Sequence, residues 1–228
     1  MPWREGIRRV EIEPSLYAAD FGRLGEQIRE LLDAGARVFH FDVGDGHFVE
    51  PITIGPVVLR SIAPLVHDGG GVLDVHLMVT NPEHHFPQVK DAGGDSVTFH
   101  VEACEEPPRA IALARSLGLG VGVSFNPETL VADAVAASAG ADLVLCMSIH
   151  PGYSGQEFMP EALPRIRKLR SQLDGHVIVQ VDGGITKDNV RSVREAGADA
   201  IVAGTAVFGG EDVAGEYEEL VRRLAADD

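Results

Sequence analysis

The chain has 228 residues, 45% of them hydrophobic, and a formal net charge of −16 at pH 7. This length and apolar content suit one α/β domain spanning residues 1–228, whereas the negative charge argues against binding nucleic acid or anionic membranes, which attract basic patches. Two cysteines and a charged amino terminus without an apolar stretch favour a cytoplasmic protein with reduced thiols over a secreted or membrane-anchored one.

Short apolar segments alternate with helical patterns along the chain. We expect eight strands, near residues 11–16, 37–43, 72–78, 96–102, 119–125, 142–149, 176–182 and 199–207. A helix is expected after the first strand, where apolar residues recur at helical spacing from Phe21 to Leu32. Asn81-Pro82-Glu83 and Asn126-Pro127-Glu128 are typical of helix starts. Alternating strands and helices predict a parallel sheet.

A four-residue motif beginning with alanine and glycine precedes every second expected strand. Its copies are Ala34-Gly35-Ala36-Arg37, Ala92-Gly93-Gly94-Asp95, Ala139-Gly140-Ala141-Asp142 and Ala196-Gly197-Ala198-Asp199. Glycine at this place suits a left-handed helix C-cap, and its return every second unit suggests four quarter-like pieces. Eight such units predict a (β/α)8 TIM barrel, with a doubly wound open sheet as the alternative.

Four ionisable residues stand near the downstream ends of apolar strands. They are His40, Asp42, His76 and Asp182. Active sites of TIM barrels gather at the carboxyl ends of the strands, and His40 and Asp42 must share a face, which is either the barrel interior or the helix side. If they face inward, two imidazoles and two carboxylates suit one zinc, iron, manganese or cobalt ion. The alternative is that they are hydrogen-bonded polar residues of the barrel interior.

Glycine-rich loops follow the last three expected strands. They are Pro151-Gly152-Tyr153-Ser154-Gly155-Gln156, Asp182-Gly183-Gly184-Ile185 and Ala203-Gly204-Thr205-Ala206. TIM barrels commonly bind phosphate through backbone N–H groups after the seventh and eighth strands, where side chains would block the approach. The first of these loops could fold over the same phosphate as a lid. Together the loops predict a phosphorylated ligand.

Five segments of the chain resemble those of the ribulose-phosphate 3-epimerase family. They are Glu13-Pro14-Ser15-Leu16, His40-Phe41-Asp42-Val43-Gly44-Asp45-Gly46-His47-Phe48, Asp74-Val75-His76-Leu77-Met78, Met147-Ser148-Ile149-His150-Pro151-Gly152-Tyr153-Ser154-Gly155-Gln156 and Val181-Asp182-Gly183-Gly184. The match runs in order from about residue 12 to residue 209. The resemblance implies a TIM barrel with one divalent metal ion, and it suggests a homo-oligomer, either a dimer or a hexamer.

The resemblance also implies roles for individual residues. His40, Asp42, His76 and Asp182 would bind the metal, and Asp42 and Asp182 would be the catalytic acid/base pair on opposite sides of the substrate. The substrate would be bound by Ser15, His76, Met78, Met147, Gly152, Tyr153, Ser154, Gly155, Gly183, Gly184, Gly204 and Thr205. The two methionines would line the pocket, and the glycine loops with Thr205 would contact the phosphate.

The chemistry of an epimerase explains why two carboxylates are needed. Inversion of a carbon next to a carbonyl removes a proton from one face and returns one to the other, and the metal would stabilise the enediolate as negative charge develops. We expect inversion of carbon 3 of a ketose phosphate, with D-ribulose 5-phosphate converted to D-xylulose 5-phosphate. One aspartate must start ionised and the other protonated.

Three departures from the family pattern bear on the substrate. Gly44 stands where the family usually has a methionine, and Ser154 replaces a glycine of the phosphate loop. The usual proline and asparagine after the Gly-His-Phe segment are replaced in Val49-Glu50-Pro51-Ile52. We expect Gly44 to leave a gap beside the reacting carbons. Allulose 6-phosphate is therefore an alternative substrate.

A keto-sugar-phosphate lyase and a non-catalytic sugar-phosphate-binding barrel are the further alternatives. Lyases of related barrels resemble an Asp-x-Lys-x-x-Asp arrangement at the second strand. Here that strand offers Asp42-Val43-Gly44-Asp45 without a lysine, which counts against the lyase.

Overall fold

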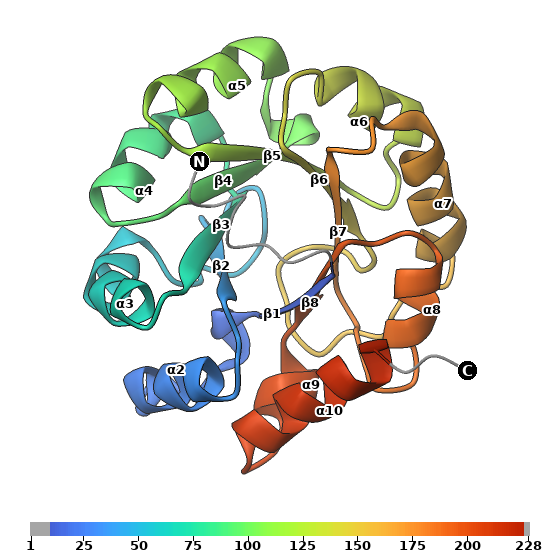
Figure 1. The fold of residues 1–228 in the computed structure, drawn as a ribbon. Helices are drawn as coiled ribbons and strands as arrows, with labels where there is room; N and C mark the ends of the chain where they lie inside the picture. Colours follow the sequence, from blue (N-terminus) through green and yellow to red (C-terminus); the bar gives the residue numbers. More distant parts are fainter. Residues whose placement is uncertain (1–9, 226–228) are drawn as a thin grey trace.

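The computed structural model describes residues 10–225, in which a ring of parallel strands is surrounded by helices (Figure 1). The strands are β1 (Glu11–Pro14), β2 (Val38–Gly44), β3 (Val72–Met78), β4 (Ser96–His100), β5 (Gly120–Phe125), β6 (Leu143–Met147), β7 (Ile178–Asp182) and β8 (Ala200–Ala203). All eight expected strands are present, and the predicted (β/α)8 TIM barrel is confirmed.

The sheet is continuous in the order β1-β8-β7-β6-β5-β4-β3-β2, so its two edges are β1 and β2. A single parallel bridge between Ser15 and His40 joins these edges and closes the barrel. Ser15 also donates its backbone N–H to Ala203 O on the other side, at 3.0 Å. Ser15 therefore stands at the seam where the first strand meets both the last and the second.

The helices between the strands cover the outside of the barrel (Figure 1). The α-helices are α2 (Leu24–Asp33), α3 (Pro56–Asp68), α4 (Phe86–Asp91), α5 (Pro107–Ser116), α6 (Val131–Ala137), α7 (Ala162–Gln172), α8 (Val190–Glu195), α9 (Thr205–Phe208) and α10 (Val213–Ala225), with 3-10 turns η1 (Leu16–Ala18), η2 (Pro82–His84) and η3 (Val101–Ala103). The glycines of the four-residue motif, Gly35, Gly93, Gly140 and Gly197, all have φ between 87° and 113°. The predicted left-handed C-caps are thus confirmed.

Four strands end earlier than expected, at Pro14, His100, Met147 and Ala203, and one expected helix start is wrong. The eighth strand ends at Ala203, because residues 205–208 form helix α9 instead of continuing the strand. Asn126 does not begin a helix, since its carbonyl accepts N–H groups from Thr129 at 3.1 Å and from the Arg165 side chain at 2.6 Å, and α6 starts only at Val131. The other expected start, at Asn81, leads into the short turn η2.

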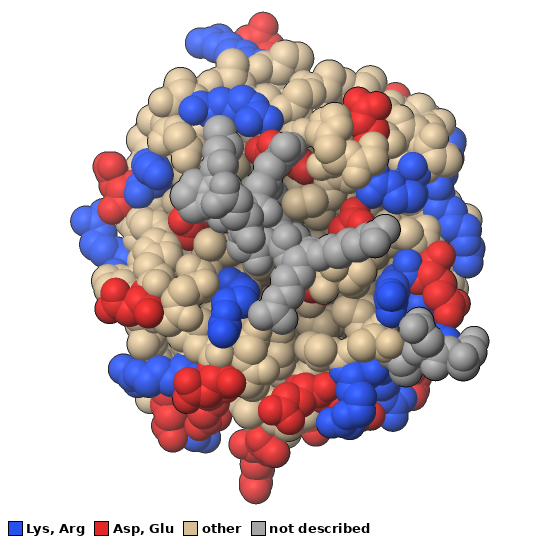
Figure 2. Space-filling view, viewed as in Figure 1, with Lys and Arg blue, Asp and Glu red and all other residues tan. Residues whose placement is uncertain are grey.

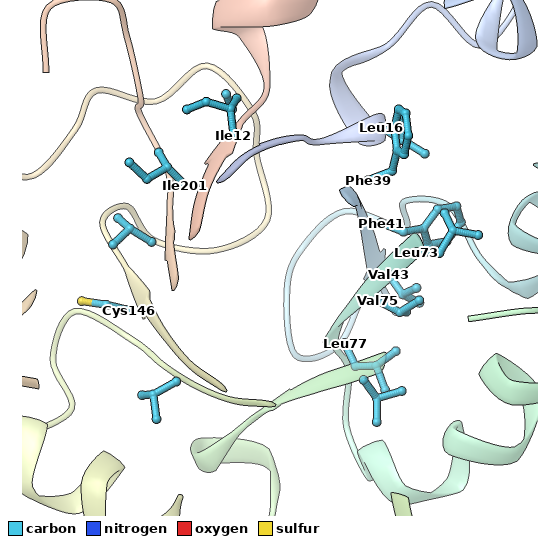
Figure 3. Packing of buried hydrophobic residues seen from close by; sticks show 14 of the residues in the cluster. Ile12, Leu16, Phe39, Phe41, Val43, Leu73, Val75, Leu77, Cys146 and Ile201 are labelled. Atoms are coloured by element: carbon cyan, nitrogen blue, oxygen red, sulfur yellow. The ribbon is translucent and has the colours of Figure 1, made fainter. Parts of the chain in front are cut away.

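Alternation along the strands separates an apolar outer layer from a polar interior. Phe39, Phe41 and Val43 of β2 lie on one side together with Leu73 and its neighbours on β3, within the cluster that includes the helix residues (Figure 3). The intervening residues of β2 therefore point into the barrel. This resolves the direction of His40 and Asp42, which face the interior.

The barrel interior combines a small apolar cluster with many polar side chains. The apolar cluster is Val38, Val72, Leu143, Leu145, Met147 and Ile149. Buried polar residues of the strands, or next to them, include Glu11, Glu13, Ser15, His40, Asp42, Asp74, His76, Ser96, Thr98, His100, Ser124 and Gln180. Polar groups are costly to bury without hydrogen-bond or ionic partners. The contacts among these side chains therefore indicate where a functional site lies.

Charged side chains of both signs lie beside one another around the rim of the face in Figure 2. Within residues 10–225, no helix has both the length and the apolar character needed to cross a membrane.

Candidate active site

Four side chains from three strands meet inside the barrel mouth. His40 Nε2 lies 3.2 Å from Asp42 Oδ1, and His76 Nδ1 lies 3.1 Å from the same oxygen. Asp182 Oδ2 lies 3.9 Å from His76 Nδ1. Asp42 and His76 are paired in register on adjacent strands, which places both side chains at the same level. The structure thus brings together all four residues predicted from the sequence.

These four residues offer a set of ligand atoms that a divalent metal ion fits. One atom from each, a ring nitrogen or a carboxylate oxygen, lies within 4.8 Å of every other. His40 Nε2 is buried and has no hydrogen-bond partner despite its closeness to Asp42. A buried ring nitrogen that lies beside a carboxylate without a hydrogen-bond partner is the arrangement expected of a metal ligand.

A layer of polar side chains lies directly beneath His40. Its other ring nitrogen, Nδ1, is 3.2 Å from Asp74 Oδ2. The Gln180 amide donates to Asp74 Oδ2 at 2.8 Å and to Glu13 Oε2 at 2.5 Å. Because Asp74 accepts the N–H at Nδ1, a neutral His40 has its lone pair at Nε2, on the side of the other three residues.

Ser15 connects the seam of the barrel to the site. Its hydroxyl donates to Asp42 Oδ2 at 2.6 Å, so the two oxygens of Asp42 have different partners. Oδ1 faces the two imidazoles, and Oδ2 is held by the serine. The serine therefore limits rotation of this carboxylate.

The two aspartates have opposite electrostatic environments. Burial alone would raise the pKa of Asp42, but the positive charge of the nearby His40, helped by His76, outweighs it and holds this pKa below its usual range. Burial and the nearby charge of Asp42 raise the pKa of Asp182 to about 7. One carboxylate is therefore ionised at neutral pH while the other retains a proton much of the time.

The histidines also differ from one another. Burial acts to lower the pKa of His40, but Asp42 and Asp74 outweigh it and raise this pKa well above the usual value. For His76 burial prevails over the attraction of Asp42, and the pKa is lowered. A metal ion would replace the proton on the His40 side of the site.

A pocket opens above the four residues at the carboxyl ends of the strands. It is lined by Ser15, Tyr17, Asp42, Met78, Met147, Ile149, Pro151, Gly152, Tyr153, Ser154, Gly155, Asp182, Gly183, Gly184, Ile185, Val202, Gly204 and Thr205. Every residue predicted to bind substrate lines it, except His76, which lies buried beneath. The three glycine-rich loops therefore share one pocket with both aspartates.

Backbone rather than basic side chains surrounds the outer part of this pocket. None of the described residues that line it is lysine or arginine. Gly184 has φ +65°, and a Cβ atom there would lie 2.3 Å from Phe158 N. Gly204 faces Ser154 Oγ, which would lie 3.3 Å from a Cβ atom. The loop at Gly184 packs too closely against the Phe158 backbone to carry a side chain. Glycine backbone therefore lines this part of the pocket, which suits an anion.

The gap expected at Gly44 does not exist. A Cβ atom at this position would lie 2.9 Å from Pro51 O, 2.9 Å from Val49 Cγ2 and 3.0 Å from Thr53 Cγ2. The segment from Val49 to Thr53 folds into the space that a larger side chain would occupy. Thr53 fixes it there, since its hydroxyl accepts the Gly44 N–H and donates to the Asp42 carbonyl.

Several residues that contribute to the site were not predicted. Asp74 and Gln180 stand two positions before His76 and Asp182, so the same alternation that marks the metal candidates also places them inside the barrel. Polar residues within apolar strands were the available signal. Tyr17, Ile149 and Val202 line the pocket but carry no comparable signal.

Comparison with known proteins relates the chain to one family. A family model described as "Ribulose-phosphate 3 epimerase family" matches residues 11–208. The chain is 43% identical over 206 residues to the ribulose-phosphate 3-epimerase of Synechocystis sp., covering 88% of each protein. It is 39% identical over 222 residues to the enzyme of that name from Escherichia coli strain K12, covering 96% of this chain and 98% of the relative.

Solved structures with lower identity share the fold. The chain superposes on 3-hexulose-6-phosphate synthase from Salmonella typhimurium with a TM-score of 0.73 and 18% identity, over 94% of this chain and 98% of that one. For thiamine phosphate pyrophosphorylase from Pyrococcus furiosus the TM-score is 0.68 at 23% identity, over 95% and 96% of the two chains. These similarities concern the barrel alone.

Proposed function

The chain belongs to the ribulose-phosphate 3-epimerase family and is an isomerase, and from this premise we propose that it interconverts D-ribulose 5-phosphate and D-xylulose 5-phosphate by inverting carbon 3. The observation that carries the proposal is that Asp42 and Asp182, from β2 and β7, line one pocket together with the glycine-rich loops. The loops would hold the phosphate and set the sugar between the carboxylates.

In this mechanism Asp42 removes the proton from carbon 3 and Asp182 returns one to the opposite face. The opposing pKa directions of the two groups suit these roles, because the acceptor must start ionised and the donor protonated. In the reverse direction the roles exchange. Met78 and Met147, which are both buried at the pocket, would exclude water from the reacting carbons.

We propose that His40, Asp42, His76 and Asp182 hold one divalent ion of zinc, iron, manganese or cobalt. The fit is supported by the unpaired Nε2 of His40 and by the mixed nitrogen and oxygen donor set. Such an ion would supply positive charge close to the oxygens that become negative as the proton leaves carbon 3. Ser15 and Asp74 would hold Asp42 and His40 in position for it.

The filled space at Gly44 supports a five-carbon substrate. The expected gap was the reason to consider allulose 6-phosphate, and the segment from Val49 to Thr53 closes it. A comparison of turnover on the two ketose phosphates tests this point. Much higher turnover of allulose 6-phosphate would overturn the substrate assignment.

The decisive experiment follows carbon 3 by NMR while the metal-loaded protein acts on D-ribulose 5-phosphate in deuterated water. We expect epimerisation with deuterium incorporated at that carbon. Asp182→Asn should abolish both, whereas Asp91→Asn, at an exposed position on α4, should leave both unchanged. Near-normal turnover in the Asp182→Asn variant would remove the acid/base assignment.

We further propose that the whole chain, residues 1–228, forms one domain and that it assembles as a dimer or hexamer. Ile52 and Val57, five positions apart in the chain, are each 82% exposed, and exposed apolar side chains that are grouped support contact with another copy. Light scattering with size-exclusion chromatography measures the assembly. A monomer at micromolar concentration would contradict it.

A further inference from the structure

A continuous line of side chains leads from the proposed metal ligand His76 toward the outside of the barrel. His76 Nε2 lies 2.9 Å from His100 Nε2, and the ring centroids are 5.0 Å apart with the ring planes inclined by 23°. His100 Nδ1 in turn lies 3.3 Å from Glu102 Oε2. His100 ends β4, and Glu102 lies in the turn η3 that follows.

The two imidazoles have little freedom to rotate. Both are fully buried, and the Phe48 ring packs on His100 with a centroid distance of 4.7 Å. His76 is held at its other nitrogen by the closeness of Nδ1 to Asp42, at 3.1 Å. The ring nitrogens therefore keep their partners, and only the positions of the hydrogen atoms can vary.

Glu102 has a fixed orientation at the outer end of this line. Its Oε1 accepts the Asn126 N–H at 2.8 Å and the Thr129 hydroxyl, which leaves Oε2 for His100. Burial acts to raise the pKa of Glu102, but these hydrogen bonds outweigh it and lower the pKa to about 2. At neutral pH the carboxylate can only accept hydrogen bonds.

Two carboxylates face this line, Glu102 at its outer end and Asp42 at His76 Nδ1, so without a metal ion the hydrogens can be arranged in two ways. A metal ion at Nδ1 would exclude a hydrogen there, and the acceptor at Glu102 favours the arrangement that remains. In that arrangement Glu102 accepts an N–H from His100 Nδ1, so the neutral ring has a lone pair at Nε2. That lone pair requires an N–H at His76 Nε2, which leaves a lone pair at Nδ1 of a neutral His76. This nitrogen is the one that faces Asp42 and Asp182.

We propose that His100 and Glu102 are positioning residues that hold His76 in the tautomer able to bind a metal ion through Nδ1. The inference rests on the proposed function only in taking His76 as a ligand. It assigns Glu102 a task beyond its contacts with Asn126 and Thr129, which by themselves serve to anchor the loop between β5 and α6.

Glu102→Gln is the sharpest perturbation, because it changes little in shape. The amide oxygen keeps the two donors at the Oε1 position, so the amide nitrogen must face His100 Nδ1. It then donates where the carboxylate accepted, and each hydrogen along the line moves to the opposite nitrogen. The result is an N–H at His76 Nδ1, where the metal ion should bind.

The test measures Co²⁺ affinity by absorption titration and imidazole tautomers by ¹⁵N NMR of the metal-free and Zn²⁺-loaded protein. We expect Glu102→Gln to weaken Co²⁺ binding by about 10- to 100-fold, and His76 of the metal-free variant to carry its hydrogen on Nδ1. Two controls should stay within about twofold of the wild-type affinity. Glu105→Gln neutralises a neighbouring exposed carboxylate, and Thr129→Val removes one anchor of Glu102 without changing charge.

Three results would overturn the inference. The first is wild-type Co²⁺ affinity in Glu102→Gln, and the second is an equal loss in Thr129→Val, which would mean that Glu102 only anchors the loop. The third is an N–H on His100 Nε2 in the zinc-loaded wild-type protein, a measurement that needs no variant to fold. Failure of the proposed ligand set looks different, because His76→Asn would then leave Co²⁺ binding unchanged.

Discussion

Replacing Asp182 by asparagine should make the metal-free protein more stable while abolishing its activity. The carboxylate is unfavourable in the folded state because burial and the charge of Asp42 raise its pKa to about 7. Asparagine has nearly the same shape and does not ionise. The residue that we propose as catalytic acid therefore reduces the stability of the fold that carries it.

The size of the effect follows from the pKa difference between the folded and unfolded chain. An acid with a raised pKa contributes its full stabilisation below its ordinary pKa, here 3.8, and loses it as the pH rises through about 7. The difference of about three units corresponds to about 4 kcal/mol at most. Water reaches the Asp182 side chain, which is 17% exposed, so we expect about 2 kcal/mol at pH 8.

Urea unfolding of the metal-stripped proteins in EDTA measures this difference. Asp182→Asn should exceed the wild type in free energy of unfolding by about 2 kcal/mol at pH 8, and by under about 1 kcal/mol at pH 5, where the folded wild type keeps its proton. The exposed control Asp91→Asn should show no such trend. A variant less stable than the wild type at pH 8, or a difference independent of pH, would refute the reasoning.

Three further outcomes follow from the site. The affinity for Mn²⁺ should rise between pH 6 and pH 8, because the pKa values of His40 and Asp182 are raised and the metal ion must displace their protons. The increase should be up to about tenfold per pH unit for each proton displaced. Calorimetric titrations that give the same affinity at each pH would contradict this. Gly184→Ala should lower the free energy of unfolding by about 1–3 kcal/mol and raise KM for the sugar phosphate, because the added Cβ would lie 2.3 Å from Phe158 N. Gly175→Ala is the control, since a Cβ there would have no atom within 4 Å, and it should change neither quantity. Gly44→Ala should cost about 1–3 kcal/mol in urea unfolding because its surroundings are filled, and a neutral effect would restore the predicted gap.

The strands could be predicted from the sequence because their signal is local. Each strand is marked by a run of apolar residues within its own sequence. The helix C-caps at glycines such as Gly35 likewise depend only on the neighbouring residues of the chain. The turn at Asn126 could not be predicted, because its N–H is taken by Glu102 and its carbonyl by Arg165, residues from distant parts of the chain. The tertiary contacts override the local preference for a helix start.

The candidate site was predictable for a similar reason, but only in part. Side chains alternate along a strand, so His40 and Asp42, two positions apart, must share one face. Which face lies inside the barrel is decided only when the barrel closes. The support from Asp74 depends on a register between β2 and β3 that the sequence does not specify. The gap predicted at Gly44 was wrong because the path of the loop after β2 cannot be read from residue types.

The single seam of the barrel bears on when the protein becomes functional during its synthesis. Strand β1 has its ladder partner in β8, so it must wait for nearly the whole chain to be made before it can pair. Ser15, at the seam, orients Asp42, and Asp182 comes from the penultimate strand. A ribosome-bound fragment ending before β7 lacks one proposed ligand, and one ending before β8 leaves β1 without its ladder partner. Metal capture and catalysis should therefore begin only after β8 has been made and the first and last strands have met.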